Sequence, residues 1–279
     1  MSFMKIDINQ IKLPAMPMVA QKIICLDMKN DRDQDSLVPV ICQCPVTSAR
    51  IISIANSSAF HGSFEISSVK EAVQKIGMTN AYNSALASAL FTLKNESGTH
   101  EFDSNKIWKH SAEIRHVMQA LAKLLRPAER PSPQDIALVA LLHDIGFLAY
   151  SAMDPELTDT LLERISNGDD SDAVSEELFG ITHDKLGAAL LSSWGIPEKI
   201  VFAVKWHHLK RYDPPYNETY VLCNLLIIAD AALMYSANTY DPHLEVMTLE
   251  KAVSLLHIDG VDLHMTIKSL KAEGLTVFL

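Results

Sequence analysis

Apolar residues recur along most of this chain at intervals of three and four positions, the spacing of one face of an α-helix. In the N-terminal third, the pattern predicts single or paired helices in PMVAQKIICLDMK, SLVPVICQCPVTSARIISIANS and SSVKEAVQKIGMTNAYNSALASALFTL. Beyond it, the pattern predicts helices near residues 106–126, 133–150, 155–166, 183–194, 197–208, 218–236 and 248–256. Alternating strand patterns are rare, so we predict an all-α fold.

Capping residues and prolines predict where some of these helices begin and where they are joined. The segment RPSPQDIALVA offers Ser132 as an N-cap, Pro133 at the first helical position and Asp135 at the third, a capping box for the helix that follows. Prolines are expected to mark helix starts and joints at Pro14, Pro17, Pro39 and Pro45.

A polar stretch, KNESGTHEFDSN at residues 94–105, interrupts the apolar pattern. A chain of 279 residues is long enough for two domains of ordinary size. We therefore predict an N-terminal helical lobe over residues 1–100 and a second helical domain over residues 101–279.

Composition and charge narrow the class of protein. Hydrophobic residues make up 48% of the chain and charged residues 21%, which is ordinary for a globular protein. The net charge of -10 disfavours nucleic acid and anionic membranes as partners. A phosphate-bearing ligand would need a local positive centre, such as a metal ion. The sequence does not indicate the oligomeric state.

Neither an export signal nor a membrane span is expected. The N-terminus lacks a basic region followed by an apolar run, and the longest apolar segment, YVLCNLLIIADAALMY, is interrupted by Asn224 and Asp230. We therefore place the protein in the cytoplasm. There its cysteines are expected to stay reduced, and the pair Cys42 and Cys44 lacks a second pair at zinc-finger spacing.

Ionisable residues stand on faces that are otherwise apolar. In ALVALLHDIGFLAY, His143 and Asp144 lie amid residues that favour burial, and Asp230 lies on an apolar helix face. A buried carboxylate requires a partner, because burying an unpaired charge costs several kcal/mol. Helical phase also places His110 on the apolar stripe of its helix, whereas His116 falls on the solvated face.

Three further histidines occur at helix ends with an inward direction. His183 opens the helix HDKLGAALLSSW, and His207 and His208 close the helix EKIVFAVKWHH. A single buried histidine is more often a hydrogen-bonded core residue than a metal ligand, and a single buried aspartate is as often capped or ion-paired. Several such groups on separate helices favour one shared metal site.

At these residues the chain resembles a known family. His110, the adjacent His143 and Asp144, and Asp230 match the ligand pattern of the HD superfamily of metal-dependent phosphohydrolases. The segments LPAMPMVAQKIICL, RIISIANSSAFHG and ISSVKEAVQKIGMTNAYNSALA resemble the HDOD branch, as does ELFGITHDKLGAALLSSWGIPEKIVFAVKWHH. The likeness spans residues 10 to 235, and it implies an HDOD-type helical lobe followed by an HD-like helical bundle that acts in bacterial signal transduction.

The resemblance also implies a ligand set and a reaction. His110, His143, Asp144 and Asp230 would hold one divalent transition metal, iron, manganese, zinc or nickel. The centre would hold one or two ions; a second would be held by His183 and His207, alone or together with His208, with Asp144 bridging, and these histidines belong to the metal centre in the related HD-GYP phosphodiesterases. His143 and Asp144 would be the catalytic pair.

Two departures from HD-GYP proteins count against their activity. Phe147 stands where that family has a lysine, and HHLKRYDPPYN lacks the glycines of the GYP motif. The positive residues nearest in sequence that could meet a phosphate are Lys109, Arg115, Lys205 and Arg211.

Three hypotheses follow. The favoured one is an HDOD-type signalling module that binds partner proteins and has a structural, sensory or weakly active metal centre. The second is a phosphohydrolase that acts on a phosphate-containing small molecule, a nucleotide or cyclic dinucleotide. The third is a metal-free interaction scaffold in which the histidines form a buried polar network.

Overall fold

The structure is a computed structural model that describes residues 15–60, 65–90, 92, 104–208, 218–237 and 250–272. The described residues form helices and turns without strands, so the all-α prediction is confirmed. They fall into two compact units, one within residues 15–92 and one within residues 104–272. The predicted boundary at residue 100 lies outside the described residues and remains a prediction.

The first unit consists of short helices packed around aliphatic side chains, with Ile23, Leu37 and Ile51 fully buried. α1 and α3 both pack on α5, and α4 packs on α3 and α5. Its helices are α1 (Met18–Ile24), α2 (Asp31–Ile41), α3 (Pro45–Ala55), α4 (Val69–Ile76) and α5 (Met78–Leu90), with a 3-10 turn at Ser58–Phe60.

The prolines of this unit have two different positions. Pro17 precedes α1 and Pro45 begins α3, as predicted. Pro39 lies inside the last turns of α2 rather than at a joint, so that part of the prediction is wrong. The turn persists because a proline near the end of a helix removes only one hydrogen bond from a segment held by its buried face. Pro14 lies outside the described residues.

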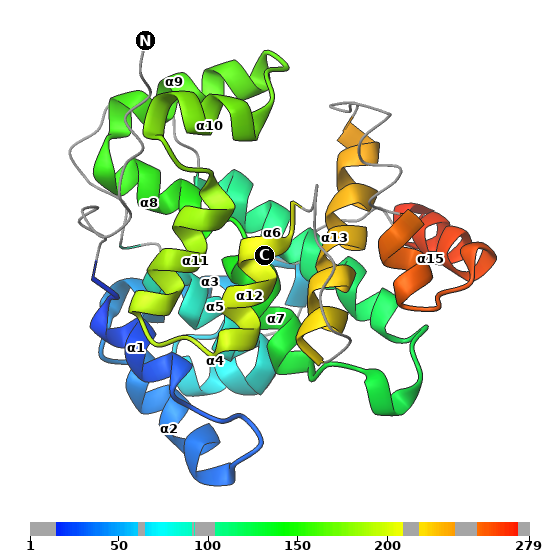
Figure 1. Ribbon diagram of the computed structural model, residues 1–279. Coiled ribbons are helices and arrows are strands. Elements are labelled where there is room, and N and C mark those ends of the chain that lie inside the picture. The colour runs from blue at the N-terminus through cyan, green and yellow to red at the C-terminus, as the bar shows by residue number, and fades with distance from the viewer. Residues whose placement is uncertain are drawn as a thin grey trace. The chain divides into compact units, whose positions relative to one another are not determined.

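The second unit is a ring of packed helices. α8 packs on α11, α11 on α12, α12 on α13, α13 on α6, and α6 on α7, which leads back into α8 (Figure 1). The helices are α6 (Ser104–Ala122), α7 (Pro133–Leu142), α8 (Ile145–Met153), α9 (Pro155–Ser166), α10 (Ser171–Phe179), α11 (His183–Ser193), α12 (Glu198–Trp206), α13 (Glu218–Ala237) and α15 (Gly260–Ala272). A 3-10 turn spans Pro127–Glu129, and residues 250–255 are also helical.

The N-cap predicted at the start of α7 is present, and the Asp135 side chain contacts it. The Ser132 hydroxyl accepts a hydrogen bond from the Asp135 backbone amide at 3.1 Å and donates one to the Asp135 carboxylate at 2.7 Å. Lys199 on α12 pairs with the same carboxylate at 2.7 Å. The Asp135 carboxylate therefore also links the start of α7 to α12.

Two helices were not predicted. α10 begins at the N-cap Asp170 and ends at Gly180, which adopts a left-handed conformation. α15 begins after Asp259, whose carboxylate accepts from two backbone amides. Apolar and polar residues are mixed in both helices, so their capping residues are a stronger signal than their periodicity.

One helix predicted from the sequence is two helices in the structure. The segment 133–150 breaks at His143 and Asp144, where α7 ends and α8 begins. The run Pro133–Met153 is long and apolar enough to cross a membrane by composition, but 72% of its apolar 18-residue window is buried inside the protein, which is typical of a core segment. The pair α2 and α3 passes the same test only as a unit bent by 107°. Placement in the cytoplasm remains a prediction.

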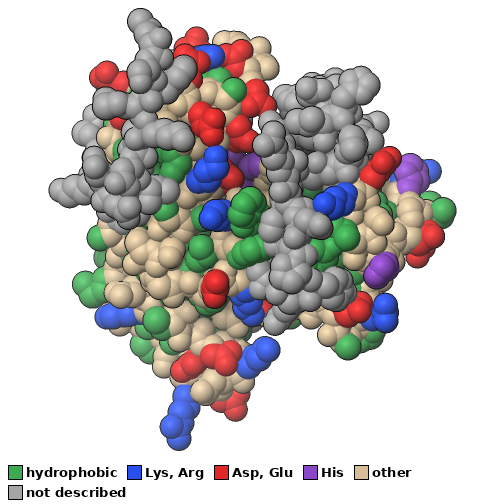
Figure 2. Space-filling view, in the orientation of Figure 1, with side chains coloured by type: hydrophobic (Ala, Val, Ile, Leu, Met, Phe, Trp, Pro, Cys, Tyr) green, Lys and Arg blue, Asp and Glu red, His purple; other side chains and the backbone are tan. Residues whose placement is uncertain are grey.

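Acidic side chains gather over α9 and α10 (Figure 2). Arg164 neutralises part of this charge through Asp169 at 2.7 Å and Glu177 at 2.9 Å. The described acidic residues of this region are Glu156, Asp159, Glu163, Asp169, Asp170, Asp172, Glu176 and Glu177.

A glycine sets the distance between α8 and α11. A Cβ atom added at Gly146 would lie 2.0 Å from the backbone oxygen of His183, so only hydrogen fits there. Gly187 on α11 is also close to α8, with its added Cβ 3.2 Å from the Gly146 nitrogen. This contact brings the backbone of His183 next to the break at His143 and Asp144.

We predict that Gly146→Ala lowers the free energy of unfolding by about 1–3 kcal/mol, because a backbone atom must move to admit the methyl group. Urea denaturation of the purified variant measures the effect. Gly260→Ala is the control, because an added Cβ there meets nothing within 4 Å and we expect a change within about 0.5 kcal/mol. Equal stabilities for the two variants would show that α8 and α11 can separate freely.

Candidate metal centre

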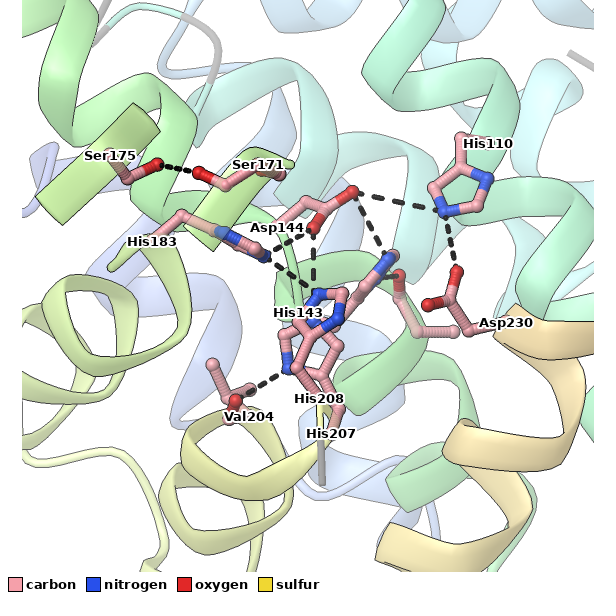
Figure 3. Close-up of polar contacts among 11 residues, drawn as sticks. His110, His143, Asp144, Ser171, Ser175, His183, Val204, His207, His208 and Asp230 are labelled. Carbon is pink, nitrogen blue, oxygen red and sulfur yellow. Dashed lines mark hydrogen bonds and ion pairs between the residues drawn. The ribbon is translucent and has the colours of Figure 1, made fainter. Parts of the chain in front are cut away.

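The break between α7 and α8 directs two adjacent side chains to one point. His143 ends α7, and Asp144 has backbone angles of φ -97° and ψ 14°, between the helical and extended regions. In a continuous helix these side chains would diverge by about 100°. At this break both side chains reach the same group of histidines (Figure 3).

The Asp144 carboxylate lies between two groups of histidines (Figure 3). Its Oδ2 atom is 3.2 Å from His143 Nε2 and 3.8 Å from His110 Nε2. Its Oδ1 atom is 3.5 Å from His183 Nε2 and 3.9 Å from His207 Nε2. Each oxygen of one carboxylate therefore faces a different pair of imidazoles.

Two more side chains complete the cluster. His110 Nε2 is 3.3 Å from Asp230 Oδ1, and His183 Nε2 is 3.0 Å from His208 Nε2. The structure thus brings together all the residues that the sequence analysis selected: His110, His143, Asp144, His183, His207, His208 and Asp230. His116, assigned to the solvated face, is exposed.

Hydrogen bonds to the main chain fix the tautomers of two histidines. His143 Nδ1 lies 2.9 Å from the Ala140 carbonyl, and His207 Nδ1 lies 2.6 Å from the Val204 carbonyl. A carbonyl oxygen only accepts, so the proton is on Nδ1 in both rings. In the neutral rings Nε2 then carries a lone pair directed toward Asp144.

Burial keeps two of the rings neutral. Burial, and then the neighbouring His208, lowers the pKa of His183 to about 4. Burial together with His208 and His143 also holds the pKa of His207 well below its usual value. Both rings therefore stay uncharged at neutral pH and keep the lone pair that binds a metal.

The other ionisable groups with shifted pKa values are His110, Asp144 and Asp230. Burial acts to lower the pKa of His110, but its hydrogen bond to Asp230 and the charge of Asp144 raise it to about 9. Burial opposes ionisation of Asp144 and Asp230, but the histidines around them keep the pKa of each carboxyl below its usual value. Both carboxylates therefore keep their negative charge, which favours a cation among the histidines.

These residues fit a bound cation. The Nε2 atoms of His143 and His207 are buried and have no hydrogen-bond partner among the described residues. For His207 this places an imidazole lone pair opposite a carboxylate oxygen, an arrangement that is repulsive without a cation between them. Two groups have ligand atoms within 4.8 Å of one another, and they share Asp144: His110, His143 and Asp144, and Asp144, His183, His207 and His208.

Other residues around the cluster were not assigned a role from the sequence. Phe147 stacks on His183, with ring centroids 4.5 Å apart and an interplanar angle of 22°. The Tyr150 hydroxyl donates to the Ile181 carbonyl and fixes the chain just before α11. The helical spacing of apolar residues gives no signal for such contacts, because they join segments that are separate in sequence.

The basic residues nearest in sequence are not placed on the cluster. Lys109 is exposed and pairs with Glu113 at 3.9 Å, and Lys205 lies over the Trp206 ring at 5.2 Å. Burial lowers the pKa of Arg115. Arg211 lies outside the described residues. Within the described residues, the ion pairs of Asp144 and Asp230 are all with histidines.

Solved structures share this fold. A protein from Marinobacter aquaeolei VT8, described as a candidate signal transduction protein, matches with a TM-score of 0.75 and 23% identity over 94% of this chain and 57% of that one. A candidate phosphohydrolase from Shewanella amazonensis SB2B matches with a TM-score of 0.66 and 22% identity over 96% of this chain and 94% of that one. At these identities the likeness shows the fold alone.

Sequence comparisons identify the family. An uncharacterized protein of Treponema pallidum (strain Nichols) is 20% identical over 202 residues, which are 71% of this chain and 38% of that protein. This chain thus spans less than two thirds of the length of both the Treponema and the Marinobacter proteins. The family model of the HDOD domain matches residues 13–210, which is more than half of the chain. The protein therefore belongs to the HDOD domain family.

Proposed function

We propose that this chain is a bacterial signal-transduction module whose His and Asp cluster binds two divalent transition-metal ions. The observation that carries the proposal is the buried Nε2 lone pair of His207, which has no hydrogen-bond partner among the described residues and faces the Asp144 carboxylate. A metal-free polar network would leave that lone pair facing a negative oxygen, so the geometry favours a cation over the scaffold hypothesis.

The contacts divide the ligands into two sets. His110, His143 and Asp230 gather on the Oδ2 side of Asp144, and His183, His207 and His208 gather on its Oδ1 side. Asp144 would bridge the two ions. Neutral imidazoles with carboxylates are ligands for iron, manganese, zinc or nickel. A regulatory role fits the description of the Marinobacter protein that shares the fold, and signalling proteins are the partners we propose.

A second candidate function is a metal-dependent phosphohydrolase that acts on a phosphate-containing small molecule. The solvent exposure of the His110 side chain, 30%, and of Asp144, 15%, favours it, because a substrate must reach the centre. Bound divalent metals lower the pKa of a water ligand and neutralise phosphate oxygens. In this chain His110 and Asp144 would meet the substrate, and the description of the Shewanella protein agrees with this reaction class.

Two features make the regulatory role the better supported. Phe147 presents an aromatic ring over His183 where the related phosphodiesterases have a lysine, and it supplies no positive charge for a phosphate. The acidic face over α9 and α10 also repels anionic substrates (Figure 2). The centre is therefore better suited to holding ions than to attracting a phosphate.

Metal stoichiometry tests the proposal. We expect elemental analysis after metal-supplemented, chelator-free purification to find about two equivalents per wild-type chain. His110→Ala and His207→Ala should each lose about one equivalent, and Asp144→Ala should lose both, because its carboxylate faces both sets of histidines.

The matched control is His116→Ala, which removes an exposed histidine from the same helix as His110. This variant should bind metal as the wild type does. A wild-type chain that retains less than about half an equivalent would contradict the metal centre.

Hydrolysis of bis-p-nitrophenyl phosphate tests the second candidate. A metal-loaded phosphohydrolase should lose at least ~100-fold in turnover on Asp144→Ala, which corresponds to about 2.7 kcal/mol of transition-state stabilisation. Equal background rates for wild type and variant, with metal bound to the wild type, would exclude hydrolysis of this phosphodiester and leave the regulatory role.

A further inference from the structure

His183 differs from the other buried histidines of the cluster in how its second nitrogen is placed. His143 and His207 stand at the ends of α7 and α12, where the carbonyl three residues earlier in the last turn accepts from Nδ1. His183 is the first residue of α11, so no helical turn precedes it to offer such a carbonyl. Its Nδ1 atom is buried and has no hydrogen-bond partner among the described residues.

The acceptor that His183 lacks lies close by. Ligand-type atoms of Asp172, His183 and Asp184 lie within 4.8 Å of one another, and Asp184 is buried with 8% exposure. The Oδ1 atom of Asp184 is also buried and without a hydrogen-bond partner in the described part of the chain. Within the described residues, a buried donor and a buried acceptor therefore lie near each other without being hydrogen-bonded.

Neighbouring donors are directed elsewhere. The Tyr150 hydroxyl donates to the Ile181 carbonyl, and the Lys185 ammonium pairs with Glu176 at 3.1 Å. Burial raises the pKa of Tyr150, so its hydroxyl keeps its proton. In these contacts the Tyr150 hydroxyl and the Lys185 ammonium face other acceptors than Asp184 Oδ1.

We propose that Asp184 is a positioning residue for His183, an inference that rests on the proposed metal centre. Asp184 accepts the Nδ1 proton of His183, directly after a side-chain rotation or through one water, and so keeps the Nε2 lone pair directed at the second ion. Asp172, at the start of α10, adds negative charge on the same side. The Nδ1 protons of His143 and His207 need no carboxylate, because the main chain already holds them.

Asp184 also stands in the first turn of α11, where a carboxylate stabilises any helix through the helix dipole. That role alone would affect folding and leave metal affinity unchanged. Glu156 occupies the corresponding position, the second residue, in α9 and is exposed. Glu156→Ala therefore removes a helix N-terminal charge without a histidine beside it, and it is the matched control.

Co²⁺ titration of the metal-free full chain by calorimetry and visible absorption tests the proposal. Asp184→Ala should weaken the second equivalent by about 10- to 100-fold and alter its absorption bands, with the first equivalent unchanged. Asp184→Asn keeps the shape and an acceptor oxygen, so its loss should be smaller. Glu156→Ala should match the wild type.

The outcomes separate the two proposals. Two equivalents in the wild type with the same second affinity in Asp184→Ala would overturn the role of Asp184 alone. A third equivalent that Asp184→Ala abolishes would also overturn it, because Asp172, His183 and Asp184 would then bind a cation themselves. A wild-type chain that binds no Co²⁺ would overturn both this inference and the proposed metal centre. If Asp184→Ala fails to fold, the Asp184→Asn titration decides, and an unchanged second affinity in that variant would count against the proposal.

Discussion

The carboxylate of Asp144 is the constraint on which the second unit depends. It is largely buried and ionised, and an ionised carboxylate at such a position must be surrounded by groups that compensate for lost hydration. The ring of helices supplies them, because α6, α11 and α12 each bring a histidine to the point where α7 gives way to α8. His143 and Asp144, where α7 gives way to α8, act on this same centre.

Much of this arrangement could be predicted from sequence because it follows helical phase. The separation of His110 from His116 and the burial of Asp230 need only the period of their own helices. The helical period does not predict that the inward faces of different helices meet at one point. The selection of the cluster therefore also depended on several such groups occurring together and on the resemblance to the HD superfamily.

The errors arose where distant contacts decide the local structure. Residues 133–150 are apolar throughout, so their pattern predicts one helix, whereas the chain breaks at His143 next to the contact between Gly146 and the backbone of His183. The part played by Asp184 was missed for a related reason. An acidic residue in the first turn of a helix is ordinary by sequence. Asp184 differs by its burial and by its closeness to His183, whose Nδ1 has no hydrogen-bond partner in the part of the chain that the structure describes.

The use of main-chain acceptors by His143 and His207 has a consequence for how this centre can change in evolution. The carbonyls of Ala140 and Val204 are present whatever side chain stands at those positions, provided that the last helical turn persists. Substitutions there leave the direction of both rings intact. Relatives could therefore differ in sequence at these positions and still keep both hydrogen bonds to the main chain. The acceptor proposed for His183 is a side chain, so a single substitution at Asp184 would remove it.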